Sequence, residues 1–358
     1  MASPGSIATN WREFSGEHHW EDLLDPLDIN LRRYIIHYGE MAEATYDAFN
    51  CDKASKYAGR SRYGKKHFFS KVGLEHGNPF KYEVTQFLYA TSEINVPIIE
   101  DVEESNWIGY VAVATDEGKA VLGRRDIVIA WRGTVRFMEW YKDLHFVLHD
   151  APYIFGDAEC KVHRGFYSVY TATNSQTKFN KTSARSQVLT EIRRLVDKHK
   201  DEEISITVTG HSLGAALATL NAVDIVRNGY NIREDESQKA SPVTAIVFAS
   251  PRVGDSDFKK FSSSQKDLRI LRICNKKDEV PRHPFCLWGY DEVGEKLEID
   301  AHKSNFLKQP GDMKSWHNLE VYLHGVAGTQ GSKGGFNLEV KRDIALVNKG
   351  MGALKEEY

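Results

Sequence analysis

A serine stands between two glycines in Gly210-His211-Ser212-Leu213-Gly214, at the point where an apolar stretch changes its periodicity. Residues 204–209 alternate β-branched side chains and predict a buried strand, whereas the alanines and leucines of 213–220 predict a helix. Gly-x-Ser-x-Gly between a strand and a helix is typical of a tight elbow that exposes a nucleophile. The glycines leave room for the turn, and the first helical amides favour an oxyanion. Ser212 is therefore the candidate nucleophile.

A serine hydroxyl becomes a good nucleophile only when a base removes its proton and a third group orients that base. In folds with this elbow the partners follow in the chain order serine, acid, histidine. Asp278 lies in a loop just past the predicted strand 268–274, where sheets of parallel strands gather their working residues, and it is the preferred acid. Asp255 and Asp257 also follow a strand and remain alternatives.

Four histidines after Asp278 are candidates for the base, namely His283, His302, His317 and His324. His324 falls inside the apolar helical pattern of residues 319–326, which indicates a packed side chain. His317 stands at the entrance of that helix, where it could reach a site, and is the preferred base. The other histidines stay open as alternatives.

The loop Arg132-Gly133-Thr134 follows a predicted strand, 126–131, and suits an oxyanion hole, because a bare glycine lets backbone amides approach a ligand. An ordinary strand-end turn is the alternative. Residues 135–148 then place large apolar side chains on one helical face. We interpret this stripe as a lid over the site, and a fixed core helix is the alternative. Its members are Phe137, Trp140, Tyr141, Leu144 and Leu148.

The elements around these residues predict an α/β fold with a mainly parallel sheet, because strands and helices alternate along the chain. Asp28 is expected to cap a long helix whose apolar side chains recur through residue 49. Residues 107–113 and 126–131 are expected to form a hairpin with its turn at 115–118. Residues 80–90 fit a strand or a short helix.

Composition bounds the function. The chain has 358 residues, of which 41% are hydrophobic, and this suffices for a sizeable core. The net charge of −3 gives no basic field for nucleic acid. No apolar run is long enough for a transmembrane helix. The four cysteines lack Cys-x-x-Cys spacing and the N-terminus lacks a signal-peptide core, so we expect a cytoplasmic protein. Zinc-protease and calcium-loop motifs are absent, so we expect neither metal nor cofactor.

These motifs together resemble those of the class 3 lipases, in particular Ala130-Trp131-Arg132-Gly133-Thr134, the serine elbow, Pro251-Arg252-Val253-Gly254, Asp278-Glu279-Val280-Pro281 and His317-Asn318-Leu319-Glu320. Further stretches narrow the resemblance to the plant class II phospholipase A1 enzymes over nearly the whole chain, namely Asn10-Trp11, Leu24-Asp25-Pro26-Leu27-Asp28 and residues 342–349.

The resemblance implies an α/β-hydrolase-type lipase with a central, mostly parallel sheet flanked by helices. Within one domain, 1–358, it implies an N-terminal helical extension (1–80), a hydrolase core (81–330) and a C-terminal tail (331–358) that is shorter than is usual in the family. It implies Ser212 as nucleophile, Asp278 as orienting acid and His317 as base. Thr134 and the backbone amide of Leu213 would form the oxyanion hole, with a lid after Thr134.

The implied activity is hydrolysis of the sn-1 ester of glycerophospholipids through an acyl-enzyme. The expected partners are the glycerolipid substrate and, transiently, a membrane or lipid surface. A neutral mono- or diacylglycerol lipase, or a galactolipid lipase, is the nearest alternative. A lipase-like interaction protein without turnover is the alternative from another class, although an intact serine, acid and histidine set argues against it.

Overall fold

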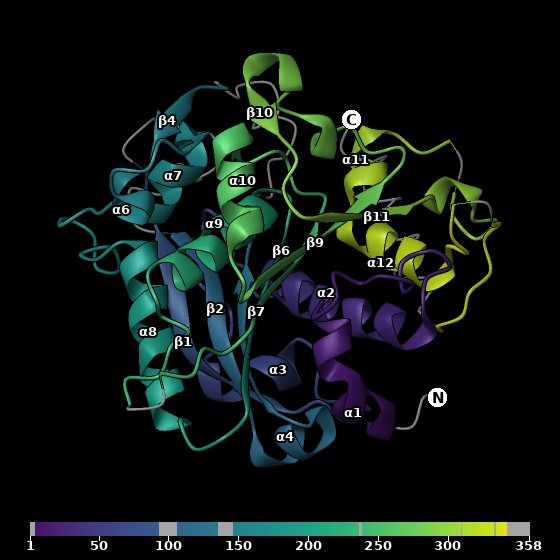
Figure 1. Cartoon of the computed structure of the whole chain (residues 1–358), viewed down its shortest axis with the longest axis horizontal. Helices are drawn as coiled ribbons and strands as arrows, with labels where there is room; N and C mark the ends of the chain where they lie inside the picture. Colours follow the sequence, from purple (N-terminus) through teal and green to yellow (C-terminus); the bar gives the residue numbers. More distant parts are fainter. Residues whose placement is uncertain are drawn as a thin grey trace.

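The computed structural model describes residues 4–92, 106–134, 146–235, 238–308, 310–332 and 334–341. Through its centre runs a sheet of seven described strands in the order β1-β2-β3-β6-β7-β9-β11 (Figure 1). The strands are β1 (Tyr82–Ala90), β2 (Asn106–Ala114), β3 (Arg125–Trp131), β6 (Ile204–His211), β7 (Val243–Phe248), β9 (Leu268–Asn275) and β11 (Glu295–Ile299). From β3 to β11 neighbouring strands are parallel, whereas β1 and β2 pair antiparallel. The mainly parallel sheet is thus confirmed.

The helices lie on both faces of this sheet (Figure 1). They are α1 (Pro4–Phe14), α2 (Ile29–Asp47), α3 (Phe68–Lys71), α4 (Asp116–Leu122), α6 (Pro152–Phe155), α7 (Arg164–Thr171), α8 (Ala184–Lys198), α9 (Leu213–Arg227), α10 (Ser256–Ser264), α11 (Met313–His317) and α12 (Leu319–Gly328). Short 3-10 turns are η1 (Lys65–His67), η2 (Val280–Arg282), η3 (Cys286–Trp288) and η4 (Ala301–Lys303).

Two apolar cores result, because successive side chains of a strand point to opposite faces. In β3, Ile127 and Ile129 face the core that α7, α8 and α9 cover. Val128 and Ala130 face the core that α2 and α12 cover. Strands buried on both faces read as near-continuous apolar runs, which is why β3 was recognisable in the sequence.

Helix α2 begins where the sequence predicts it. The Asp28 carboxylate accepts hydrogen bonds from the amides of Asn30 (2.8 Å) and Leu31 (2.9 Å), which caps the helix. Twelve of its residues are buried, and the helix crosses β6, β7 and β3. Helix α2 therefore contributes directly to the core behind the serine elbow.

The predicted hairpin is only partly right. β2 and β3 do pair antiparallel, but α4 connects them in place of a tight turn. The hydroxyl of Thr115 caps α4 by accepting from the amide of Gly118 (3.1 Å), and Gly123 ends it with φ +75°. Residues 115–118 thus form the start of a helix. Their capping residues are of the same types as those that favour a turn.

A small antiparallel sheet, β10-β8-β5-β4, stands beyond the end of the main sheet (Figure 1). Its strands are β4 (Leu148–Asp150), β5 (Lys161–His163), β8 (Gly254–Asp255) and β10 (Tyr290–Asp291). Among the described residues, no helix is long and apolar enough to cross a membrane.

Candidate active site

Ser212 lies in a strained turn between β6 and α9, with φ +59° and ψ −124°. A Cβ atom on Gly210 would come within 2.4 Å of the Gly214 carbonyl oxygen, and one on Gly214 within 2.2 Å of the Trp131 carbonyl oxygen. Any larger residue at either position would therefore push the backbone apart. A side chain at such a positive φ costs roughly 1–3 kcal/mol and persists only where its surroundings enforce it, as at active sites.

His317 connects the serine to the acid. Its Nε2 lies 2.9 Å from the Oγ of Ser212, and its Nδ1 lies 2.7 Å from Oδ2 of Asp278. All three side chains are buried. Because the carboxylate can only accept, Nδ1 carries the proton and Nε2 is left to accept from the hydroxyl. This is the arrangement in which a histidine removes a serine proton.

Two further contacts fix the carboxylate of Asp278. Its Oδ1 accepts from the amide of Val280 (3.0 Å), and its Oδ2 also accepts from the phenol of Tyr322 (2.6 Å). Burial raises the pKa of Tyr322 well above its usual value, so the phenol stays a donor. Tyr322 lies on α12, and the apolar pattern of that helix gave no sign of this contact with the acid.

The alternative acids do not face the serine. Asp255 caps α10 by accepting from the amide of Phe258 (2.9 Å). Asp257 forms an exposed ion pair with Lys260 (2.9 Å). Both side chains lie at the N-terminal end of α10, although they come after β7 as Asp278 comes after β9.

The alternative histidines also have other partners. His324 hydrogen-bonds to the hydroxyl of Ser304 (2.7 Å) and is fully buried in α12, as its apolar pattern indicates. His302 lies beside the ring of Trp316. His283 bonds to a backbone carbonyl in its own loop. The structure thus brings Asp278 and His317, of all these candidates, to Ser212.

The candidate oxyanion loop lies directly against the serine elbow. A Cβ atom on Gly133 would come within 2.6 Å of the His211 carbonyl oxygen. Thr134 follows and is buried, with 7% of its surface exposed. Leu213, on the other side, is the first residue of α9, where helical amides have no partner within the helix. A glycine at position 133 therefore permits the close packing of this loop against the elbow.

Comparisons with known proteins identify the family. A family model described as "Lipase (class 3)" matches residues 128–288. Phospholipase A1-IIgamma of Arabidopsis thaliana is 53% identical over 98% of this chain and 87% of its own length. Phospholipase A1-II 4 of Oryza sativa subsp. japonica is also 53% identical, over 99% of this chain and 90% of its own length. The chain belongs to the class 3 lipase family. The resemblance read from the motifs is therefore confirmed.

Solved lipase structures share the fold of this class 3 lipase. Lip2 lipase from Yarrowia lipolytica has a TM-score of 0.52 and 21% identity, over 77% of this chain and 81% of that chain. The Rhizomucor miehei lipase propeptide complex has a TM-score of 0.50 and 20% identity, over 76% and 69%. The expected α/β-hydrolase-type architecture is confirmed.

The lipase has a further hydrogen-bond chain that motif analysis missed. The phenol of Tyr46, at the end of α2, lies 2.7 Å from Nδ1 of His211. The Nε2 of His211 lies 2.7 Å from the backbone carbonyl of His317. Burial, foremost, and the neighbouring His317 hold the pKa of His211 well below its usual value, so the ring is neutral. Nε2 then donates to the carbonyl, and Nδ1 accepts from Tyr46.

Residues at and just after the end of α2 also contact the candidate oxyanion loop. The guanidinium of Arg132 lies over the ring of Phe49, 3.7 Å from its centroid, and donates to the carbonyl of Gly133 (2.9 Å). A Cβ atom on Gly133 would overlap the Tyr46 oxygen, at 2.1 Å. Helix α2 lies outside the residues that the family model matches, so this support comes from the N-terminal extension.

The predicted lid falls mostly outside the described residues. Phe137, Trp140, Tyr141 and Leu144 all lie there. Leu148 does not continue a helix: it is the first residue of strand β4 and pairs with His163. The helical stripe is therefore wrong at its last member, because pairing within the small sheet determines the conformation there.

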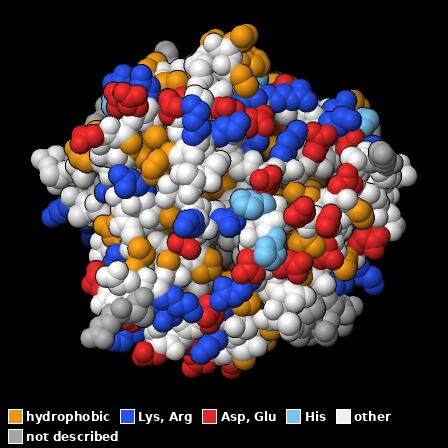
Figure 2. Space-filling view, viewed as in Figure 1, with side chains coloured by type: hydrophobic (Ala, Val, Ile, Leu, Met, Phe, Trp, Pro, Cys, Tyr) orange, Lys and Arg blue, Asp and Glu red, His pale blue; other side chains and the backbone are white. Residues whose placement is uncertain are grey.

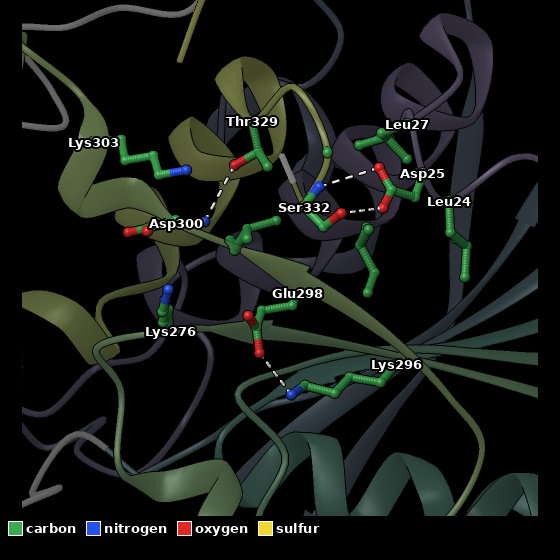
Figure 3. A pocket seen from close by; sticks show the side chains of 13 residues that line it. Leu24, Asp25, Leu27, Lys276, Lys296, Glu298, Asp300, Lys303, Thr329 and Ser332 are labelled. Atoms are coloured by element: carbon green, nitrogen blue, oxygen red, sulfur yellow. Dashed lines mark hydrogen bonds and ion pairs between the residues drawn. The ribbon is translucent and has the colours of Figure 1, made fainter. Parts of the chain in front are cut away.

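A hollow lined by Asp25 and by residues of β11 and η4 is not part of this site (Figure 3). It has a volume of about 190 Å³ and none of the three linked side chains lines it. Its lining is strongly charged: Lys296 pairs with Glu298 (2.7 Å), and the carboxylate of Asp25 accepts from the hydroxyl of Ser332 (2.5 Å). Such a charged lining does not suit an acyl chain. Within the described parts of the chain, no three His, Cys, Asp or Glu side chains group as metal ligands.

Proposed function

We propose that this lipase hydrolyses the sn-1 acyl ester of glycerophospholipids. The hydrogen-bond chain from Ser212 through His317 to Asp278, at a strained elbow, carries the proposal. The head group and position rest on the relatives, which are about half identical to this chain and are named phospholipase A1-II.

The proposed reaction follows from the geometry. His317 removes the proton of Ser212, whose Oγ attacks the ester carbonyl carbon. The amide of Leu213 and Thr134 stabilise the oxyanion, and Asp278 stabilises the imidazolium. The oxyanion collapses, the ester C–O bond breaks, and His317 gives its proton to the leaving alcohol, a lysophospholipid. Water, deprotonated by His317, then attacks the acyl-enzyme and releases the fatty acid and the free serine.

The test is a panel of positionally labelled phospholipids, galactolipids and acylglycerols, assayed with the parent protein and with Ser212→Ala. We expect release of the sn-1 label from phospholipids and a loss of at least about 10³-fold in Ser212→Ala. Faster release from acylglycerols or galactolipids would replace the proposed head group. A parent protein that neither hydrolyses any lipid nor reacts with a fluorophosphonate would point to an interaction protein.

We further propose that the lipase works in the cytoplasm and touches lipid surfaces transiently. Its cysteines, Cys51, Cys160, Cys274 and Cys286, are free, which suits a reducing compartment. The asparagine of its one Asn-x-Thr sequon, Asn180, is fully buried and donates to the carbonyl of Tyr89 (2.8 Å), so the folded chain offers it no room for a glycan. Fractionation of cells that express the full chain would test the location.

A further inference from the structure

Large apolar side chains are exposed together at one end of the molecule. Leu287 is 96% exposed, Trp288 47% and Phe285 44%, all in or beside η3. Val147, which precedes β4, is 47% exposed. We call these four residues the apolar tip. Figure 2 shows hydrophobic side chains at the top of the view, where β10 is labelled in Figure 1.

The apolar tip is held in place by contacts beneath it. The ring of Phe146 stacks on that of Trp288, with centroids 4.6 Å apart. Arg252 supports the loop from below: its backbone amide donates to the carbonyl of His283 (2.8 Å) and its guanidinium to the carbonyl of Pro284 (2.9 Å). Its guanidinium is itself paired with Glu292 (2.9 Å). These contacts hold the loop in place while its apolar side chains stay exposed. The free protein therefore keeps apolar surface in water, which is unfavourable.

The apolar tip lies near the C-terminal ends of the parallel strands, where the site is. Its loop follows Asp278 and η2, directly after the end of β9. Val147 directly precedes β4, which belongs to the same small sheet as β10. In Figure 1, β10, which follows η3 in the chain, lies at the end toward which the parallel strands run. The apolar tip therefore lies at the same end of the parallel strands as Ser212, which follows β6.

We propose that the apolar tip inserts into the surface of aggregated lipid and so docks the enzyme on its substrate. This inference rests on the proposed function, which supplies a lipid aggregate as the partner. Leu287 is almost fully exposed, and a fluid lipid surface accepts such a side chain without a matching groove. Trp288 and Phe285 are bulky aromatics beside it, and tryptophan is enriched at the boundary between water and hydrocarbon. Apolar side chains that enter that boundary gain the burial that they lack in water.

The experiment measures binding separately from turnover. The parent for this test is Ser212→Ala, so that the lipid is not consumed, and the probe is phosphatidylcholine vesicles sedimented with the protein. Leu287→Glu in that background should bind at least about tenfold more weakly, because a carboxylate replaces the inserted leucine. Phe306→Glu is the matched control: Phe306 is also an exposed apolar residue, at 50%, but lies outside the tip, so binding should stay unchanged.

Equal vesicle binding by Leu287→Glu and its parent would overturn the inference, as would an equal loss in Phe306→Glu. A dimer that Leu287→Glu converts to a monomer, with vesicle binding unchanged, would also overturn it and assign the tip to contact between copies. In the active enzyme, Leu287→Glu should lower hydrolysis of vesicles but not of a short-chain ester in solution. Loss of both would contradict the docking role, whereas failure of the parent on every ester would contradict the proposed function alone.

Discussion

The phenol oxygen of Tyr46 lies 2.7 Å from Nδ1 of His211, although 165 positions separate the two residues. His211 precedes the candidate nucleophile, and its other nitrogen donates to the backbone of His317. One neutral ring thus connects the N-terminal helix α2, the serine elbow and the segment that carries the base. Tyr46 and His211 are positioning residues, since the described contacts link them to the site through other groups.

Tyr46→Phe should therefore lower kcat by between about 10- and 100-fold with little change in KM, because small displacements of the base and oxyanion loop slow the chemistry. The buried Nδ1 of His211 would lose its donor, which costs about 1–3 kcal/mol of folding free energy. Steady-state kinetics and urea unfolding measure both effects.

Tyr38→Phe is the matched control for that prediction. Tyr38 is another buried tyrosine of α2, and its phenol donates to the carboxylate of Asp126 (2.8 Å), away from the elbow. This variant should lose stability while its kcat stays the same. If Tyr46→Phe and Tyr38→Phe lose stability alike and both keep kcat, Tyr46 has a structural role only.

Thr134→Val tests the oxyanion loop. If the hydroxyl contributes to the oxyanion hole, kcat should fall by up to about 10²–10³, or about 2.7–4 kcal/mol, with KM little changed. Thr134→Ser, which retains the hydroxyl, should restore most of the rate. A rise in KM at constant kcat would show that Thr134 packs against the substrate and does not stabilise the transition state.

Trp140→Ser tests the lid predicted for residues 135–148. A lid that opens at lipid surfaces predicts a large loss on vesicles or micelles, a small loss on a short-chain ester in solution and little change in melting temperature. A fixed core helix predicts the opposite, a loss of about 3–5 kcal/mol in stability and parallel losses on both substrates. Thermal unfolding and the two assays distinguish them.

The stability of the lipase should fall as the pH drops below about 6.5. Burial lowers the pKa of His163 to about 3, so between these values the unfolded chain binds a proton that the folded chain does not. Stability then decreases by up to about 1.4 kcal/mol per pH unit for this residue. His163→Asn keeps an acceptor for the amide of Gly165 at the start of α7 and removes the titration.

Urea unfolding at pH 7, 6 and 5 measures that slope. His163→Asn should show a shallower decrease than the parent, even if its stability at pH 7 is lower. His149→Asn, at an exposed histidine, should leave the slope unchanged. An identical slope in all three proteins would exclude His163 as a source of acid sensitivity.

The sequence by itself determined the features that depend on neighbouring residues. The elbow around Ser212, the strand before it and the helix after it follow from periodicity and two glycines. The cap at Asp28 is equally local, since its carboxylate reaches amides two and three residues ahead. Where two local signals coincide, as at Thr115, the sequence favoured a turn and the chain forms a helix.

Only the tertiary structure decided which distant groups meet. Asp255 and Asp278 both follow strands, and the packing of the α11 and α12 segments against β9 and η4 brings His317 to Asp278. Tyr46 reaches His211 because α2 crosses the sheet behind the elbow, which no spacing along the chain encodes. The exposure of Leu287 is equally invisible in the sequence, since spacing within a loop does not determine which of its side chains other segments cover. Periodicity indicates which face of a single segment is buried, whereas these contacts depend on how all the segments pack together.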